Sequence, residues 1–131
     1  MRFMLFLFLF IPIEQVEAQY PFSKITEIDE ENLALKSTVL IRDHQGFLWI
    51  GTSSGIFKYN SAIPENITAG LKVKPYITAL FEDGTGTIWA GCKNGQVLKV
   101  RNKQVSVFNP GEGFPKVDIT SIVEDSKKRL W

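Results

Sequence analysis

The sequence predicts an all-β fold built from propeller blades, each a four-stranded antiparallel sheet of about 40 residues. One stretch of the chain recurs at a fixed offset, and each copy contains short apolar strands separated by turns rich in Gly, Asp and Asn. Because a blade can bury its apolar faces only against neighbouring blades, such a repeat determines the architecture of the whole chain.

The composition is that of a globular protein and excludes several classes of function. Of the 131 residues, 44% are hydrophobic and 22% are charged, and the net charge is +1. This balance excludes a disordered chain and gives no electrostatic footprint for a nucleic-acid partner. One cysteine and one histidine are too few for an internal disulfide or for the common zinc sites. We therefore predict no metal site, no cofactor site and no catalytic residue.

Residues 1–18 are predicted to be a signal peptide. Arg2 precedes an unbroken apolar run at 3–13, which would span roughly 16 Å as a helix, against the ~30 Å hydrocarbon core of a membrane. The sequence Val-Glu-Ala that follows fits the small-residue pattern of cleavage, and we place the cut after Ala18. The alternative is a buried N-terminal helix. The exported chain would carry one thiol, Cys92, which is best buried in an oxidising compartment.

One motif recurs from residue 37 onward. The copies at 37–55 and 77–95 share five residues at a constant offset of 40, and a third copy starts at 119 with Lys128 in place of the turn glycine. A catalytic residue is normally single, so repetition favours turn formation by the aspartates and packing between blades by the tryptophans, over acid–base catalysis or stacking on sugars. The shared residues are Asp43, Gly46, Trp49, Gly51 and Gly55, then Asp83, Gly86, Trp89, Gly91 and Gly95, then Asp125 and Trp131.

The second copy gives the clearest series of strands. Its first apolar segment ends at Asp83, where Asp-Gly-Thr-Gly supplies the side-chain hydrogen bonds and the positive φ that a tight turn needs. Strand alternation then places Ile88 and Ala90 on one face and Trp89 on the other. Further turns follow at 93–95 and 101–103. We expect strands at 77–82, 87–92, 96–100 and 104–108.

In the first copy, the same pattern predicts strands at 37–42, 47–52 and 55–60. Residues 61–76 contain two prolines and a glycine, which leave the position of a fourth strand open. Nothing helical is expected after the signal, because the one helix-like window, 28–36, lacks a clean apolar stripe.

These elements divide the chain into five parts. A closed propeller needs four to eight blades. We therefore interpret the sequence as the N-terminal fragment of a longer protein; the alternative is a complete small protein that oligomerises into a ring. The parts are a signal peptide at 1–18, an opening strand and lead-in at 19–36, a first blade at 37–76, a second blade at 77–118, and the start of a third, truncated blade at 119–131.

The motif resembles the two-component regulator propeller repeat. The similarity lies in Asp-x-x-Gly-x-Leu/Ile-Trp-Ile/Ala-Gly with a further Gly four residues on, found at 43–55 and 83–95. Residues 113–115, Gly-Phe-Pro, are similar to the Gly-Leu-Pro lead-in of the family, and residues 20–26 are similar to its opening strand. Cys92 departs from the family by standing where Thr is usual.

The resemblance implies the N-terminal part of a periplasmic, ligand-sensing propeller from a hybrid two-component signalling protein. The whole protein would be a histidine kinase, anchored in the inner membrane and homodimeric. It would sense glycan-derived oligosaccharides and control transcription. This part of the chain would be no enzyme and would bind no cofactor. Two alternatives stay open, a fragment of an exported propeller glycosidase or lyase and a fragment of an adhesive or structural exported propeller.

Three smaller features allow two interpretations each. His44 lies in the first Asp–Gly turn, as a ligand contact or as a solvated turn residue. Asn66-Ile67-Thr68 matches the N-glycosylation triplet, a pattern that also arises by chance. Ligands of propellers bind to loops, and the candidate loops here are 53–54, 93–94 and 61–76, none of which stands out as a site.

Overall fold

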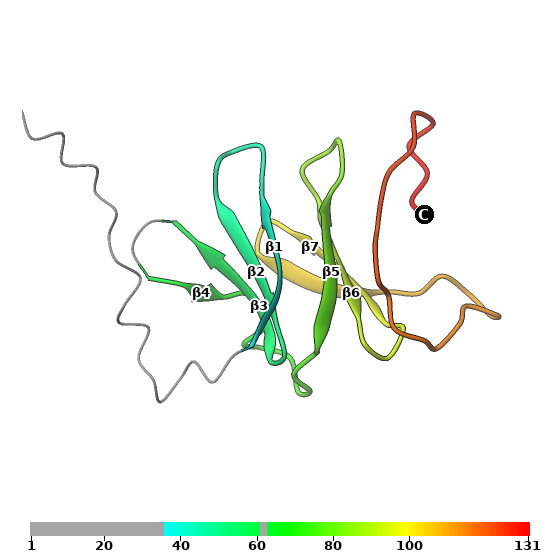
Figure 1. Cartoon of the computed structure of the whole chain (residues 1–131), viewed down its shortest axis with the longest axis horizontal. Coiled ribbons are helices and arrows are strands. Elements are labelled where there is room, and N and C mark those ends of the chain that lie inside the picture. The colour runs from blue at the N-terminus through cyan, green and yellow to red at the C-terminus, as the bar shows by residue number, and fades with distance from the viewer. Residues whose placement is uncertain (1–35, 61–62) are drawn as a thin grey trace, which may run out of the picture.

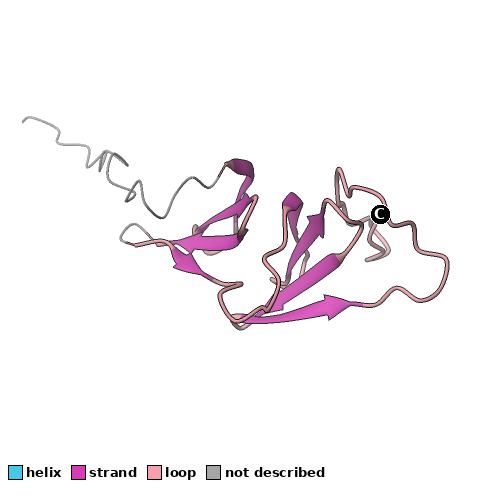
Figure 2. Ribbon diagram, turned by 90° about the horizontal axis from the view of Figure 1, so that it is seen from below, coloured by secondary structure: helices cyan, strands magenta, loops and turns pink. Residues whose placement is uncertain are grey.

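The described part of this computed structural model, residues 36–60 and 63–131, consists of two four-stranded antiparallel sheets (Figure 1). Within these residues no helix occurs, as Figure 2 shows by its colours. The predicted all-β fold of antiparallel blades is confirmed. The proposed signal peptide, its cleavage at Ala18 and almost all of the 19–36 segment lie outside the described residues. No helix of the length and apolarity needed to cross a membrane is found in the described part.

Each sheet is a simple meander in which neighbouring strands in sequence are neighbours in space. The strands differ from the predicted ranges by at most one residue at either end. The first sheet contains β1 (Ser37–Arg42), β2 (Leu48–Thr52), β3 (Gly55–Tyr59) and β4 (Glu65–Asn66). The second contains β5 (Ile77–Glu82), β6 (Ile88–Cys92), β7 (Val97–Arg101) and β8 (Gln104–Phe108).

The strand that the sequence left open is β4, which has two residues and pairs with β3 through Asn66 and Glu65. Pro64 precedes it and has no backbone N–H to extend the ladder. After it, Ile67 still donates its backbone N–H to Ile56 O at 2.9 Å before the chain turns away. The first sheet is therefore completed by a short outer strand.

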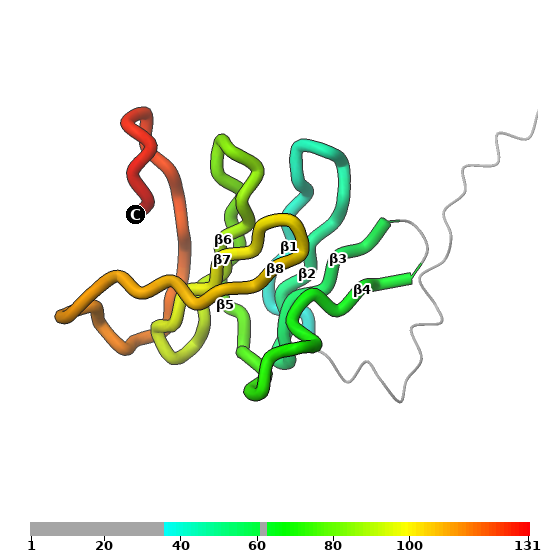
Figure 3. The backbone as a smooth tube through the Cα atoms, turned by 180° about the vertical axis from the view of Figure 1, so that it is seen from behind, coloured from blue at the N-terminus to red at the C-terminus, as the bar shows by residue number. Residues whose placement is uncertain are grey.

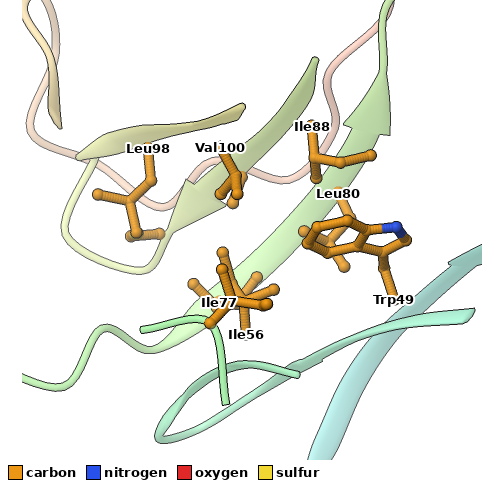
Figure 4. Packing of buried hydrophobic residues seen from close by; sticks show 10 residues of the cluster. Trp49, Ile56, Ile77, Leu80, Ile88, Leu98 and Val100 are labelled. Carbon is orange, nitrogen blue, oxygen red and sulfur yellow. The ribbon is translucent and has the colours of Figure 1, made fainter. Parts of the chain in front are cut away.

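The core lies between the two sheets, which pack face to face (Figure 4). Strand alternation points Trp49 and Ile56 of the first sheet toward the second, where they meet residues from β5, β6 and β7. Ile56 and Ile77 are fully buried. The second sheet contributes Ile77, Leu80, Ile88, Ala90, Cys92, Leu98 and Val100 to this cluster.

A glycine in each inner hairpin allows the sheets to approach this closely. A Cβ atom placed on Gly51 would lie 2.6 Å from Val39 Cγ1 and 2.7 Å from Ile77 Cγ2. Gly91 stands in the same relation to the next copy, where an added Cβ would overlap Ile119. The isoleucine that opens the second or third copy, Ile77 or Ile119, therefore lies against the bare backbone of the copy before it.

A hydroxyl group bridges the same junctions. Thr38 Oγ1 lies 2.6 Å from Ile77 O and 3.0 Å from Gly51 O. Thr78 Oγ1 lies 2.6 Å from Ile119 O and 3.1 Å from Gly91 O. Each threonine thus ties its own hairpin to the first residue of the next copy, Ile77 in β5 or Ile119.

The third copy begins a further hairpin in the position that these contacts set. Ile119 donates its backbone N–H to Cys92 O at 3.2 Å. Val123 and Trp131 then exchange backbone hydrogen bonds of 3.0 and 2.9 Å across the turn. Trp131 is 69% exposed, whereas Trp49 and Trp89 are 5% and 8% exposed, because the described residues place no sheet against it.

We predict that Gly51→Ala destabilises the fold by about 1–3 kcal/mol, the usual cost of forcing an extra methyl group into a packed core. The matched control is Gly70→Ala, since a Cβ there has nothing within 4 Å and the residue has no positive φ. Its effect should stay within about 0.5 kcal/mol. Urea unfolding followed by tryptophan fluorescence measures both. Equal effects of the two variants would contradict the close approach.

Candidate functional site

The repeated aspartate of the first copy closes its own hairpin turn. Asp43 Oδ1 accepts the backbone N–H groups of Gln45 and Phe47 at 3.0 and 2.8 Å. Its other oxygen, Oδ2, accepts the indole N–H of Trp49 at 2.8 Å. The carboxylate therefore joins the turn to the core tryptophan six residues later.

The other two copies form the same set of bonds. Asp83 accepts the N–H groups of Thr85 and Thr87 at 2.8 and 3.1 Å and that of the Trp89 indole at 2.7 Å. Asp125 accepts Lys127 N at 2.8 Å, Arg129 N at 3.0 Å and Trp131 Nε1 at 3.1 Å. In each copy both carboxylate oxygens are engaged by the donors of the copy's own hairpin.

The turns need a left-handed residue three positions after the aspartate. Gly46 and Gly86 supply it, with φ values of 91° and 79°. Lys128 adopts φ 64° at this position in the third copy, so the turn forms without the glycine. Its ammonium lies 2.7 Å from Glu124 Oε1, which raises the pKa of the lysine. The departure from the motif therefore changes the turn residue but not the turn.

A cation lies over each repeated tryptophan. Lys58 Nζ is 4.9 Å from the ring centre of Trp49, and Lys99 Nζ is 5.4 Å from that of Trp89. Arg129 lies 5.2 Å from the ring of Trp131. Such contacts contribute about 0.5–1 kcal/mol at exposed sites. The faces of Trp49 and Trp89 are thus occupied by the protein itself.

The hydrogen bonds determine the charge state of the aspartates. Burial raises the pKa of Asp83, but hydrogen bonds from Thr85, Trp89 and Thr87 outweigh it and hold the pKa at about 2. Burial also opposes ionisation of Asp43, and hydrogen bonds from Trp49 and Phe47 again leave its pKa lowered. These carboxylates stay ionised under ordinary conditions, which suits a turn acceptor and not a general acid.

Cys92 is buried in the core at 1% exposure. Burial raises the pKa of its thiol to about 11, so the reactive thiolate is scarce near neutral pH. Among residues 36–60 and 63–131, no three His, Cys, Asp or Glu side chains gather as metal ligands would.

The glycosylation triplet has a structural use. Asn66 Oδ1 accepts both the backbone N–H and the hydroxyl of Thr68 at 3.0 Å. Thr68, at 3% exposure, in turn accepts the N–H of Ile56 at 3.1 Å. The three residues close the turn after β4, in which Asn66 Oδ1 and the Thr68 hydroxyl are both engaged.

Two contacts between the sheets are not evident from the sequence. Glu82 Oε2 accepts the backbone N–H of His44 at 2.8 Å, and Glu82 Oε1 lies 2.5 Å from His44 Nδ1. His44 is thus a largely exposed turn residue that also contacts the next copy. Lys103 and Glu65 form a second bridge at 2.9 Å. Partners 38 residues apart could be paired only once the sheets are known to stack.

Of the candidate ligand loops, 53–54, 93–94 and the part of 61–76 that follows β4 lie on one edge of the pair of sheets, opposite the Asp–Gly turns. We call it the loop edge, and it comprises the turns 53–54 and 93–95, the segment 67–76 and the segment 109–118 (Figures 1 and 3). Sequence reasoning missed the last segment as a loop candidate. Gly95 allows the segment 109–118 to pass close to the turn 93–95, because a Cβ there would lie 2.7 Å from Pro115 O and 2.9 Å from Lys116 Cα.

The two last glycines of the motif differ in place. Gly55 opens β3 and pairs with Thr52, whereas Gly95 lies within the longer turn between β6 and β7. Their φ values are 129° and 80°. Gly55 and Gly95 are 40 residues apart, like the other repeated residues, but they occupy different positions in their sheets.

A cavity of about 590 Å³ opens between the turn 93–95 and the segment 109–116. One wall is Val97 and Phe108, which take the places that Ile56 and Ile67 take in the first sheet. Ile67 is 9% exposed under the second sheet, and Phe108 is 42% exposed. The cavity therefore borders the face of the second sheet that corresponds to the covered face of the first sheet. Within the described residues no further sheet covers it.

One comparison with known proteins gives a match. Residues 35–54 match the family described as "Two component regulator propeller", the family that the sequence motif resembles. The match includes four of the five shared residues of the first copy, from Asp43 to Gly51, and ends just before Gly55. No curated protein matches the chain.

We predict that Asp83→Asn weakens the acid dependence of stability. The folded pKa of about 2 lies below the ordinary value of 3.8, so the ionised group stabilises the fold above about pH 4 and this stabilisation is lost as the pH falls toward 2. The variant should be less stable at pH 7 and should show a smaller decline between pH 4 and 2. Urea midpoints across this range give the measurement. Asp118→Asn, at an exposed loop position, is the control, and an unchanged slope in Asp83→Asn would refute the role.

Proposed function

We propose that this chain forms part of a periplasmic β-propeller that binds a ligand and regulates a two-component signalling pathway. The repeat matched at 35–54 belongs to a family of regulatory propellers, which is not a catalytic family. Export by the 1–18 segment and assembly into a longer, membrane-anchored and homodimeric histidine kinase belong to the same proposal. The supporting reason for these finer points is the resemblance of the motifs.

The observation that carries the proposal is the contact between copies, which occurs twice with the same atoms. Thr38 and Thr78 each reach the carbonyl of the next isoleucine at 2.6 Å. Each sheet also has an outer face that corresponds to one of the faces buried between the two sheets. These outer faces are partly uncovered, since Leu40 is 57% exposed and Phe108 is 42% exposed. Both features suit a series of blades that continues around a ring.

Binding fits the described residues better than catalysis. A glycosidase needs two carboxyl groups free to exchange protons with the substrate. Asp43, Asp83 and Asp125 repeat with the fold, and each is engaged by the donors of its own hairpin. We infer that the loops bind the ligand, whereas the hairpins stabilise the blades. We also infer that the ligand is a glycan-derived oligosaccharide.

The first test is the size and place of the native protein, detected with an antibody against residues 36–60. We expect a band several-fold larger than the 14.8 kDa of this chain, in the membrane fraction. A band at the mass of the chain alone, in the soluble fraction, would refute the signalling protein.

The second test measures transcription in cells that produce the protein, after addition of partially hydrolysed polysaccharides. At least one glycan should induce a set of genes, and deletion of residues 37–118 should abolish that response. Gly70→Ala is the matched control and should respond normally. A response that survives the deletion, or no response to any glycan, would reject the sensing function.

A further inference from the structure

The turn between β6 and β7 contains the dipeptide Asn94-Gly95. The side-chain amide of an asparagine has an acyl carbon, Cγ, which the backbone nitrogen of the next residue can attack to close an imide ring. A glycine has no Cβ to hinder that attack, whereas a proline has no N–H to lose. The other asparagines of the described residues precede Ser, Ile, Lys and Pro, and they are Asn60, Asn66, Asn102 and Asn109.

The side chain of Asn94 is exposed and is turned toward the backbone that follows it. Its Oδ1 accepts the backbone N–H of Gln96 at 3.1 Å. When Cγ is attacked, negative charge develops on Oδ1, and a hydrogen-bond donor already directed at this oxygen stabilises that charge. The turn therefore supplies an electrophilic carbon next to an unhindered nitrogen.

A second dipeptide with the same chemistry, Asp83-Gly84, is protected by the fold. Both carboxylate oxygens of Asp83 accept hydrogen bonds from their own hairpin. Those bonds hold the pKa of Asp83 at about 2, so the group is ionised at neutral pH. An ionised carboxylate resists attack by a nucleophile. The two dipeptides look alike in the sequence, and the structure distinguishes them.

The nitrogen of Gly95 becomes available when the turn opens. In the closed turn Gly95 is buried and donates its N–H to Cys92 O at 3.1 Å. The same carbonyl accepts the N–H of Ile119 at 3.2 Å, so it keeps a donor when the bond to Gly95 breaks. We therefore expect the nitrogen to react through local opening of the turn, more slowly than in a free peptide.

We propose that Asn94 is a site of spontaneous deamidation. A base takes the N–H proton of Gly95, and the nitrogen attacks Cγ of Asn94. The new N–Cγ bond replaces the bond from Cγ to Nδ2, and Nδ2 takes up a proton and leaves as ammonia. Water then opens the imide, giving aspartate if it cleaves the N–Cγ bond and isoaspartate if it cleaves the bond to the original main-chain carbonyl. No oxidant or reductant takes part.

Isoaspartate at this position would disturb the contact that places the third copy. It inserts a methylene group into the main chain of a turn that is closed by the bond from Cys92 N to Gln96 O at 2.9 Å. The turn has no free space beside Gly95, where an added Cβ would lie 2.7 Å from Pro115 O. The longer turn should therefore displace the segment 109–118 and weaken the bond between Ile119 and Cys92.

The test is peptide mapping by mass spectrometry of the full-length protein, kept folded in mildly alkaline buffer. A synthetic peptide of residues 91–98 is incubated beside it until the peptide has reacted completely. Asn94 should deamidate before any other asparagine of the described residues, with release of ammonia and formation of both aspartate and isoaspartate. Asn94→Ser should abolish this product, because a hydroxyl group has no acyl carbon; serine already stands 40 residues earlier, at Ser54.

The aged protein is then separated by ion exchange, since each deamidation adds one negative charge. Amide hydrogen exchange of residues 109–119 should be faster in the isoaspartate form than in the fresh protein. Asn94→Asp, which adds the charge without the methylene group, should exchange as the fresh protein does. An intact Asn94 after complete reaction of the peptide, or earlier deamidation of another described asparagine, would overturn the site. Unchanged exchange in the isoaspartate form would overturn its effect on the third copy.

Discussion

The arrangement of the two sheets depends on the contact between a glycine backbone and the isoleucine that opens the next copy. A side chain on Gly51 or Gly91 would occupy the space of Ile77 or Ile119. The approach brings the carbonyl of the isoleucine within 2.6 Å of a threonine hydroxyl, a hydrogen bond that contributes about 0.5–1.5 kcal/mol. Burial of the core between the sheets follows from this approach, because Trp49 and Ile56 reach the second sheet only at this separation.

A second interaction, within each hairpin, stabilises its turn without contacts from neighbouring copies. The Asp–Trp bond joins residues six positions apart in all three copies, including the third, whose tryptophan is exposed. The turn therefore keeps its shape before a neighbouring sheet covers it. Local closure by the aspartate and packing through the glycine act on different parts of the hairpin, so the same motif serves folding and assembly at once.

The local and repeated features of the fold could be predicted from the sequence. Apolar alternation and Asp–Gly turns predict the strands of both sheets to within a residue, and the pattern predicts Trp89 on the face opposite Ile88. The end of the first sheet could not be predicted, because β4 has only two paired residues, and side-chain bonds of Asn66 and Thr68 take over after it. The pair His44–Glu82 and the place of 109–118 depend on how separate segments stack, which no periodicity in the sequence records.

The recurrence of one contact at two junctions also has a geometric meaning. The same three kinds of residue meet at both junctions, with the threonine hydroxyl 2.6 Å from the carbonyl of the isoleucine in each, so both junctions favour the same orientation of one unit on the next. A constant rotation per unit gives a constant curvature. The threonine, the glycine and the isoleucine together therefore determine the angle between neighbouring units. In the ring that we propose, a change that tilted this junction by a few degrees would leave each sheet intact and would alter the number of sheets needed for closure.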